Sequence, residues 1–415
     1  MLPPVLEIYV VWHPGDRAGA AVADEVVRHF HGSLFTGLLD GAVEVYVRSA
    51  GWCGPDDAPR PIPMPHAPPA NGLEQAQLTV VVPVLGYELA AAVESGQGAW
   101  HRYVTQIGTG QRLSPDRVAV FPLVLQRGAV EGTELGRLLN RFHGLDRGPR
   151  DVGETVAERR CRDLAQGIAQ FAGGAPTGRL TVFISHTQQP GNQEQAAVRE
   201  LIARVRSIIG HTRLNDFFST NDLQVGTDWG DALRANAAAS ALLALRTDRY
   251  ASRAWCQWEV LLAKRAGMPV VILDALHQGE ERGSFLLGNA PCVPVRHRAG
   301  GWVEADIRRG VNLLVDECLK RTLWGRQREL AGRLPGLDVT WWAPHAPEPV
   351  TLAAWLAERH PAGAAVRGGG RIRILHPDPP LGPAERQVLD QVAQVGGLDT
   401  PLDILTPRTL AARGG

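Results

Sequence analysis

Apolar runs that predict strands alternate with amphipathic stretches that predict helices through the middle of the chain. A largely apolar run at 180–184 stops at Ser185-His186, as a buried strand does where it enters a loop. The later elements continue this alternation: strands near Phe217, at 241–245 and at 269–273, and helices at 195–209, at 229–239, from Trp255 and at 306–324. Strands that alternate with helices predict a parallel sheet covered on both faces.

The first part of the chain has the same rhythm. Strands are predicted at 7–12, 43–47, 78–84 and 118–123, and a helix at 20–30. A segment dense in Pro, Gly and Asp at 54–71 interrupts the pattern, and we interpret it as a surface loop because strands resume after it. A further helix at 154–171 ends at Ala172-Gly173-Gly174-Ala175-Pro176, where we expect a domain boundary.

The last part of the chain holds two similar units, each a strand, a Pro-rich turn and a helix. The strands are expected at 339–342 and 372–375, and the helices from Leu352 and at 383–395. Two such units make only a small sheet, so we expect them to dock on a neighbour. The predicted organisation is an α/β domain at 1–150, a helical linker at 151–177, an α/β domain at 178–325 and a small α/β region at 326–415.

Composition narrows the class of protein. The chain has 44% hydrophobic and 21% charged residues, which is typical of a globular protein, and its 43 basic residues balance its 43 acidic ones. No global field therefore favours nucleic acid or a membrane surface. Five scattered cysteines without CxxC spacing favour reduced thiols over disulfides or a zinc site. With no evident secretion signal and no apolar run near 20 residues, we expect a soluble cytoplasmic protein.

Three segments of the predicted domain at 178–325 together resemble the Toll/interleukin-1 receptor (TIR) family. They are Phe183-Ile184-Ser185-His186, the turn Asp222-Leu223-Gln224-Val225-Gly226-Thr227-Asp228-Trp229, and Ser252-Arg253-Ala254-Trp255-Cys256-Gln257-Trp258-Glu259. In that family the first strand ends in a similar Phe-Ile-Ser, the second leads into the BB loop, and a Trp-x-x-x-Glu motif carries the glutamate of members that cleave NAD+. The resemblance implies a flavodoxin-like parallel sheet.

The resemblance also implies roles for individual residues. The catalytic carboxylate would be Glu259. The residues that would bind substrate are Ser185, His186, Phe218, Asp222 and Trp255. The residues that would form the BB loop and an assembly contact are Asp222, Leu223, Gly226 and Trp229.

Cleavage of the nicotinamide–ribose bond needs little acid–base chemistry. The sugar passes through an oxocarbenium-like state, as in glycoside hydrolysis, but nicotinamide leaves as a neutral molecule and needs no general acid. One desolvated carboxylate can hold the ribose and stabilise the developing positive charge. The products would be nicotinamide and ADP-ribose or a cyclic isomer. NAD+ would be the substrate, and no cofactor is implied. A metal site is not expected, because the sequence has no second histidine at ligand spacing.

The sequence leaves several alternatives open. Glu259 could be an ordinary solvated helix residue, and Ser185 could be a turn former or helix cap. The chain could also be a non-enzymatic TIR signalling scaffold, or a nucleotide-binding sensor. If it is an enzyme, the resemblance implies a homo-oligomer assembled through TIR domains and a role in defence against phage.

The N-terminal domain reads as a diverged copy of the same fold. Val10-Val11-Trp12-His13 stands where Phe183-Ile184-Ser185-His186 does, and Val104 follows Trp100 by four residues, as Glu259 follows Trp255. This copy would lack the carboxylate. Our hypothesis is that residues 1–150 form a non-catalytic TIR-like module for self-association or for sensing a protein trigger; the alternative is an unrelated α/β domain.

Overall fold

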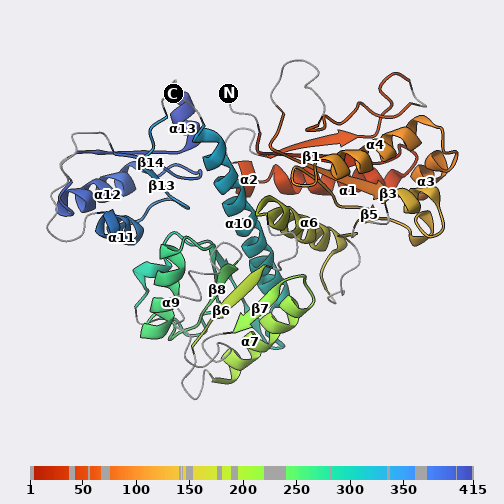
Figure 1. Cartoon of the computed structure of the whole chain (residues 1–415). Helices are drawn as coiled ribbons and strands as arrows, with labels where there is room; N and C mark the ends of the chain where they lie inside the picture. The colour runs from red at the N-terminus through yellow and green to blue at the C-terminus, as the bar shows by residue number, and fades with distance from the viewer. Residues whose placement is uncertain are drawn as a thin grey trace, which may run out of the picture. The chain divides into compact units, whose positions relative to one another are not determined.

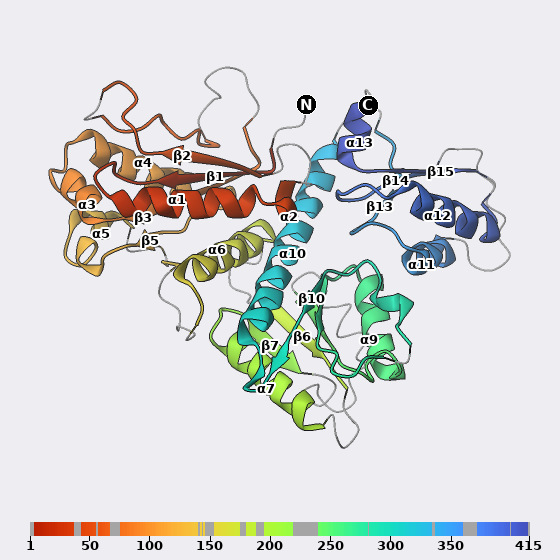
Figure 2. The same ribbon diagram turned by 180° about the vertical axis from the view of Figure 1, so that it is seen from behind.

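The computed structural model describes most of the chain. The described residues are 4–36, 43–54, 57–66, 75–139, 142, 144–145, 153–174, 180–187, 195–218, 240–280, 282–333, 337–359, 372–398 and 400–413. The chain divides into two compact units, residues 1–150 with 154–176 (unit 1) and residues 151–153 with 177–415 (unit 2). Both are α/β, with parallel sheets (Figures 1 and 2). Within the ranges just given, no helix is long and apolar enough to cross a membrane.

Unit 1 is built on a parallel sheet in the order β2-β1-β3-β4, with β5 also paired to β3. Its strands are β1 Leu6–Val11, β2 Val43–Arg48, β3 Leu78–Leu85, β4 Val118–Val120 and β5 Leu123–Val124. All eight residues of β3 are buried, which explains why all of them except Thr79 are apolar and why the strand does not alternate. The single strand predicted at 118–123 is two short strands, because Pro122 between them has no N–H to give to the ladder.

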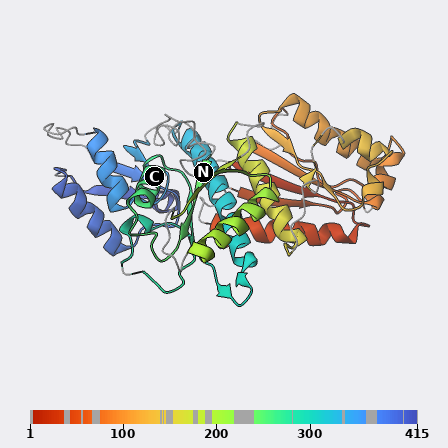
Figure 3. The same cartoon turned by 90° about the horizontal axis from the view of Figure 1, so that it is seen from below.

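Helices cover both faces of this sheet (Figure 3). One face is covered by α1 Arg17–Phe30 and α6 Val156–Ala172; the other by α3 Tyr87–Glu94, α4 Ala99–Leu113 and α5 Glu134–Leu139. The short helices α2 Ser33–Thr36 and η1 Arg127–Ala129 complete the unit. Part of the segment interpreted as a surface loop is buried instead, because Ile62 and Met64 pack into the core formed with α3, α4 and α5.

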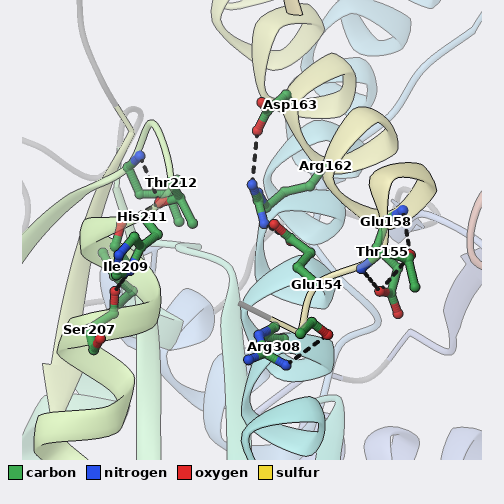
Figure 4. Close-up of polar contacts among 12 residues, drawn as sticks. Glu154, Thr155, Glu158, Arg162, Asp163, Ser207, Ile209, His211, Thr212 and Arg308 are labelled. Atoms are coloured by element: carbon green, nitrogen blue, oxygen red, sulfur yellow. Dashed lines mark hydrogen bonds and ion pairs between the residues drawn. The ribbon is translucent and has the colours of Figure 1, made fainter. Parts of the chain in front are cut away.

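Helix α6 begins with a capping box (Figure 4). The Thr155 hydroxyl accepts from the backbone N–H of Glu158, and the Glu158 carboxylate accepts from the backbone N–H of Thr155. One turn later, buried Arg162 donates to Glu154 and to Asp163. Arg160 also pairs with Glu25 of α1, at 3.5 Å, so α6 belongs structurally to the sheet of unit 1.

Unit 2 contains a parallel sheet in the order β7-β6-β8-β9-β10. The strands are β6 Thr181–Ser185, β7 Asn215–Phe218, β8 Ser240–Arg246, β9 Val270–Asp274 and β10 Cys292–Pro294. One face is covered by α7 Gln195–Gly210 and α10 Glu304–Ala331, and the other by α9 Ala254–Arg265 and η5 Phe285–Leu287 (Figures 1 and 2). A two-stranded hairpin of β11 His297–Arg298 and β12 Gly301–Trp302 precedes α10. The helix predicted at 229–239 lies outside the described residues.

Two polar contacts order the end of α7 before β7 (Figure 4). The His211 ring Nδ1 lies 2.6 Å from the Ser207 carbonyl oxygen, and the Thr212 hydroxyl donates to the Ile209 carbonyl at 2.6 Å. The same hydroxyl accepts from the backbone N–H of Leu214. The Ser207 and Ile209 carbonyls also accept the backbone N–H groups of His211 and Thr212, so the side chains add second partners at the helix end.

The C-terminal part of unit 2 has a parallel sheet of its own. The strands β13 Trp341–Trp342, β14 Ile372–Leu375 and β15 Leu402–Leu405 lie in chain order, with α11 Pro349–Arg359, α12 Pro383–Val395 and α13 Pro407–Ala412. The sequence pattern predicted two strands here and missed β15. The small sheet packs on α10, where Trp324 contacts Leu375 and Leu405 and its Nε1 donates to the Ala343 carbonyl at 2.9 Å.

Candidate active site

Ser185 occupies the carboxyl end of the central strand β6. It pairs in register with Ala244 of β8, and its side chain is 1% exposed. A parallel sheet brings the carboxyl ends of neighbouring strands to one edge, where open α/β sheets hold their ligands. The serine therefore places a buried hydroxyl at the edge where a binding site is expected.

Glu259 reaches this hydroxyl from α9. The Ser185 hydroxyl donates to Glu259 Oε2, and the Trp255 indole Nε1 donates to Oε1 at 2.7 Å. The carboxylate is only 2% exposed, so it is held by two fixed donors and not by water. Trp255 and Glu259 meet because residues four apart lie on one face of a helix. The structure thus brings together three of the residues predicted from the sequence.

Tyr250 completes the network and is absent from the residues predicted above. Its hydroxyl oxygen lies 2.6 Å from Ser185 Oγ, and the ring is 1% exposed. A serine hydroxyl has one proton, which goes to Glu259, so Ser185 Oγ must accept from Tyr250. A tyrosine shortly after a buried strand is the only sequence signal for it, and aromatic residues in such places usually serve packing alone. The result is one continuous chain, Tyr250 to Ser185 to Glu259, with Trp255 on the far oxygen.

Burial sets the protonation of this network. It raises the pKa of Glu259 to about 7, although the hydrogen bonds from Ser185 and Trp255 favour the charged form and oppose the rise. It also raises the pKa of the Tyr250 phenol well above its usual range, and that of the neighbouring Cys256 thiol to about 12. At neutral pH Tyr250 and Cys256 are neutral, whereas Glu259 titrates close to neutral pH. A carboxyl tuned to neutral pH at a sheet edge is typical of a functional site.

His186 lies beside the network, but the contacts described for its ring do not reach Glu259. The ring Nδ1 is 3.2 Å from the Thr187 carbonyl oxygen and is the donor in that bond, and the His186 carbonyl accepts from Cys256 Sγ at 3.5 Å. Burial lowers the pKa of the imidazole, so the ring is neutral at pH 7. The adjacent Thr187 hydroxyl is 3.4 Å from that of Thr247, which follows β8. His186 can offer a neutral imidazole to a ligand, not a cation.

The remaining predicted residues are placed only in part. The backbone of Phe218 ends β7 and pairs with Ile184 of β6. Asp222, Leu223, Gly226 and Trp229, predicted to form the BB loop, lie outside the described residues.

The equivalent position in unit 1 carries no carboxylate. Helix α4 precedes β4 as α9 precedes β9, and Trp100 and Val104 are the second and sixth residues of α4, as Trp255 and Glu259 are of α9. Val104 is 1% exposed and belongs to the apolar core of unit 1. The ring of His13 lies 5.2 Å from that of Trp100. Unit 1 therefore buries an apolar contact where unit 2 buries an ionisable one.

Among the residues that the structure describes, no three His, Cys, Asp or Glu side chains gather in a way that could hold a metal ion. Comparison with known proteins assigns no family to the chain, because no protein-family model and no curated protein matches it.

Proposed function

We propose that unit 2 is an NAD+ glycohydrolase in which Glu259 stabilises the ribosyl cation formed as nicotinamide leaves. The observation that carries the proposal is the Ser185–Glu259–Trp255 arrangement, a buried carboxylate fixed by two donors at the carboxyl edge of the sheet. The strand order β7-β6-β8-β9-β10 supports it, since this is the order 2-1-3-4-5 of flavodoxin-like folds that the TIR resemblance implies.

In this proposal each group has a distinct task. Each carboxylate oxygen has two acceptor positions, so Glu259 can keep Ser185 and Trp255 and still accept from ribose hydroxyls. The two donors hold the carboxylate in place before the reaction, which spares the energy of reorganising it as charge develops. Trp255 is 43% exposed although its Nε1 donates to Glu259. In this proposal its ring moves to admit the substrate and then packs against the ribose.

The raised pKa of Glu259 predicts a pH dependence. The ionised form is the active one, so kcat/KM should fall as pH drops through about 7, the pKa in the free enzyme. The cationic nicotinamide of bound NAD+ favours the carboxylate, so the midpoint of kcat should lie at a lower pH than that of kcat/KM. If the two midpoints coincided, or if that of kcat lay at the higher pH, Glu259 would have no direct contact with the positively charged part of the substrate.

The experiment that tests the activity is chromatography of nucleotides after incubation of concentrated protein with NAD+. We expect nicotinamide with ADP-ribose or its cyclic isomer, and no product from Glu259→Gln. Trp255→Phe should lower turnover about 10-fold or more, since it removes a hydrogen bond to a charged group. Trp258→Phe is the matched control on the same helix, because Trp258 is 53% exposed, and it should retain full turnover.

The TIR resemblance extends the proposal to assembly and biological role. We expect turnover to rise with protein concentration, through contacts between copies made by the segment 222–229, and a role in defence against phage. Wild-type protein that is inert even when forced to assemble would disprove the enzyme. Binding of NAD+ without turnover would identify a nucleotide sensor, and neither binding nor turnover would leave a signalling scaffold.

A further inference from the structure

A cavity lies in unit 2, at a place that the proposed activity does not use. It has a volume of about 240 Å³ and is bordered by the end of α9, the middle of α10 and the turns that follow β13 and β14. Pro344 and His345 come from the first turn, and Asp378 from the second. The cavity is therefore at the carboxyl ends of two parallel strands, the edge where α/β sheets bind ligands.

Basic residues are concentrated around this cavity. The two lysines of the chain, Lys264 and Lys320, both line it, together with Arg321. The lysines are already neutralised: Lys264 Nζ lies 2.9 Å from Glu348 Oε1, and Lys320 Nζ lies 3.0 Å from Glu317 Oε1. Lys264 also donates to the Gly288 carbonyl at 2.6 Å, which fixes its position in the wall.

Arg321 is the third basic residue of the lining, and it takes part in neither of these ion pairs. Its one described hydrogen bond, from Nη2 to the Ala266 carbonyl, is 3.5 Å long, and within the described part of the chain no carboxylate pairs with it. Burial lowers the pKa of the guanidinium, and the opposing effect of the Cys318 thiol is smaller. Leaving a desolvated charge uncompensated is costly, and an oxyanion in the cavity would remove that cost.

The wall beside Arg321 is shaped by Gly267. This glycine has φ +61°, and a Cβ there would lie 2.8 Å from Pro344 Cγ and 3.4 Å from Arg321 Nη1. A larger residue would push Pro344 and Arg321 apart. The absence of a side chain at Gly267 therefore leaves room for Pro344 and the Arg321 guanidinium at the cavity wall.

The pKa of His345 reflects the electrostatic environment of the cavity. Burial and the positive charges of Lys264 and Arg321 lower the pKa of its imidazole to about 4. The imidazole is thus neutral at pH 7, and it can donate or accept a hydrogen bond without adding a charge to the cavity. The surroundings of His345 favour negative charge, although the lining also includes the carboxylates of Glu317 and Asp378.

We propose that this cavity binds a small phosphorylated ribose compound, with the phosphate on Arg321 and the ribose hydroxyls on the Asp378 carboxylate. The guanidinium fork matches a phosphate in geometry and charge, and carboxylates are the usual acceptors for ribose hydroxyls. Apolar walls of Met268, Pro269 and Pro291 would pack against the sugar. The volume is below the roughly 300 to 1,000 Å³ of sites for drug-sized ligands, which favours a ligand no larger than a mononucleotide.

The test is calorimetric titration of the full chain with ribose 5-phosphate, adenosine 5′-monophosphate and inorganic phosphate. We expect one site for the two ribose phosphates and much weaker binding of inorganic phosphate. Arg321→Gln should weaken binding about 10- to 100-fold, as expected for loss of hydrogen bonds to a charged group. Glu259→Gln, at the separate candidate active site, should bind as wild type does.

Each other outcome overturns the proposal. Loss of binding in Glu259→Gln but not in Arg321→Gln would place the ligand at the candidate active site. Equal affinity for inorganic phosphate would show a bare anion site, and no binding at millimolar concentration would show no site. If Arg321→Gln does not fold, as judged by its thermal melting, Lys320→Glu at the cavity wall replaces it. That reversal should weaken binding about tenfold, and unchanged affinity would refute the assignment.

Discussion

Replacement of Glu259 by Gln should remove the proposed activity and yet stabilise the protein at alkaline pH. The folded pKa of about 7 lies above the 4.5 of an unperturbed glutamate. A raised folded pKa gives stability that is fully present below the unfolded value and is lost as pH rises through about 7. Between pH 5 and pH 8 the ionisation of Glu259 should therefore cost about 2.5 kcal/mol of unfolding free energy.

Glutamine fits the same hydrogen bonds without the charge. Its carbonyl oxygen can accept from Trp255, and its amide can donate to Ser185 Oγ, which then donates to Tyr250. The variant should therefore lose the penalty and keep the packing. Only the ionisation differs, so the pH dependence of the difference between the two proteins isolates this one group.

The assay is urea unfolding of wild type and Glu259→Gln at pH 5 and pH 8, followed by tryptophan fluorescence. Unit 2 holds eight of the eleven tryptophans, so its transition dominates the signal. We expect the variant to gain about 2.5 kcal/mol relative to wild type between the two pH values, because every other titrating group cancels. A change below about 0.5 kcal/mol would mean that Glu259 has an ordinary pKa, and the reasoning from burial would be wrong.

Two further substitutions test neighbouring contacts. Ser185→Ala removes a donor to Glu259 and leaves the buried Tyr250 hydroxyl without its acceptor. We expect the unfolding free energy in urea to fall by about 1 to 3 kcal/mol and the pH–activity midpoint to lie above that of wild type. An unchanged midpoint would show that Ser185 does not influence the pKa of Glu259. Lys264→Met leaves the buried carboxylate of Glu348 without its cation and should lower the unfolding free energy by about 3 to 5 kcal/mol. The double variant with Glu348→Leu should regain most of that loss. Equal stability of the single and double variants would show that the pair is not coupled.

The alternation of apolar runs and helical periodicity determined most of the elements. Strands such as β3, β6 and β8 are buried on both faces, so they appear as continuous apolar runs that no surface element shares. The sequence pattern missed an element where the local alternation of apolar and polar residues is ambiguous. Strand β15 is only four residues long and carries Asp403 in its interior, and it is a strand because it pairs with β14.

The candidate site shows the same division. The four-residue spacing of Trp255 and Glu259 is a local property of one helix, so the sequence alone was enough to place them on one face. The hydrogen bond between them is a finding of the structure. Tyr250 and Ser185 are 65 positions apart, and only the pairing of β6 with β8 brings their hydroxyls to 2.6 Å.

The charge state of the site was beyond the sequence for a physical reason. A Trp-x-x-x-Glu motif does not say whether its carboxylate faces water or the core, and it is burial that raises the pKa of Glu259 to about 7. The cavity around Arg321 is a similar case, since it is lined by segments from 264 to 379 that no spacing rule connects. The sequence determined most of the strands and helices and which carboxylate to examine. The tertiary structure decided the partners and the protonation of that carboxylate, because desolvation depends on what packs around a group and not on its neighbours in the chain.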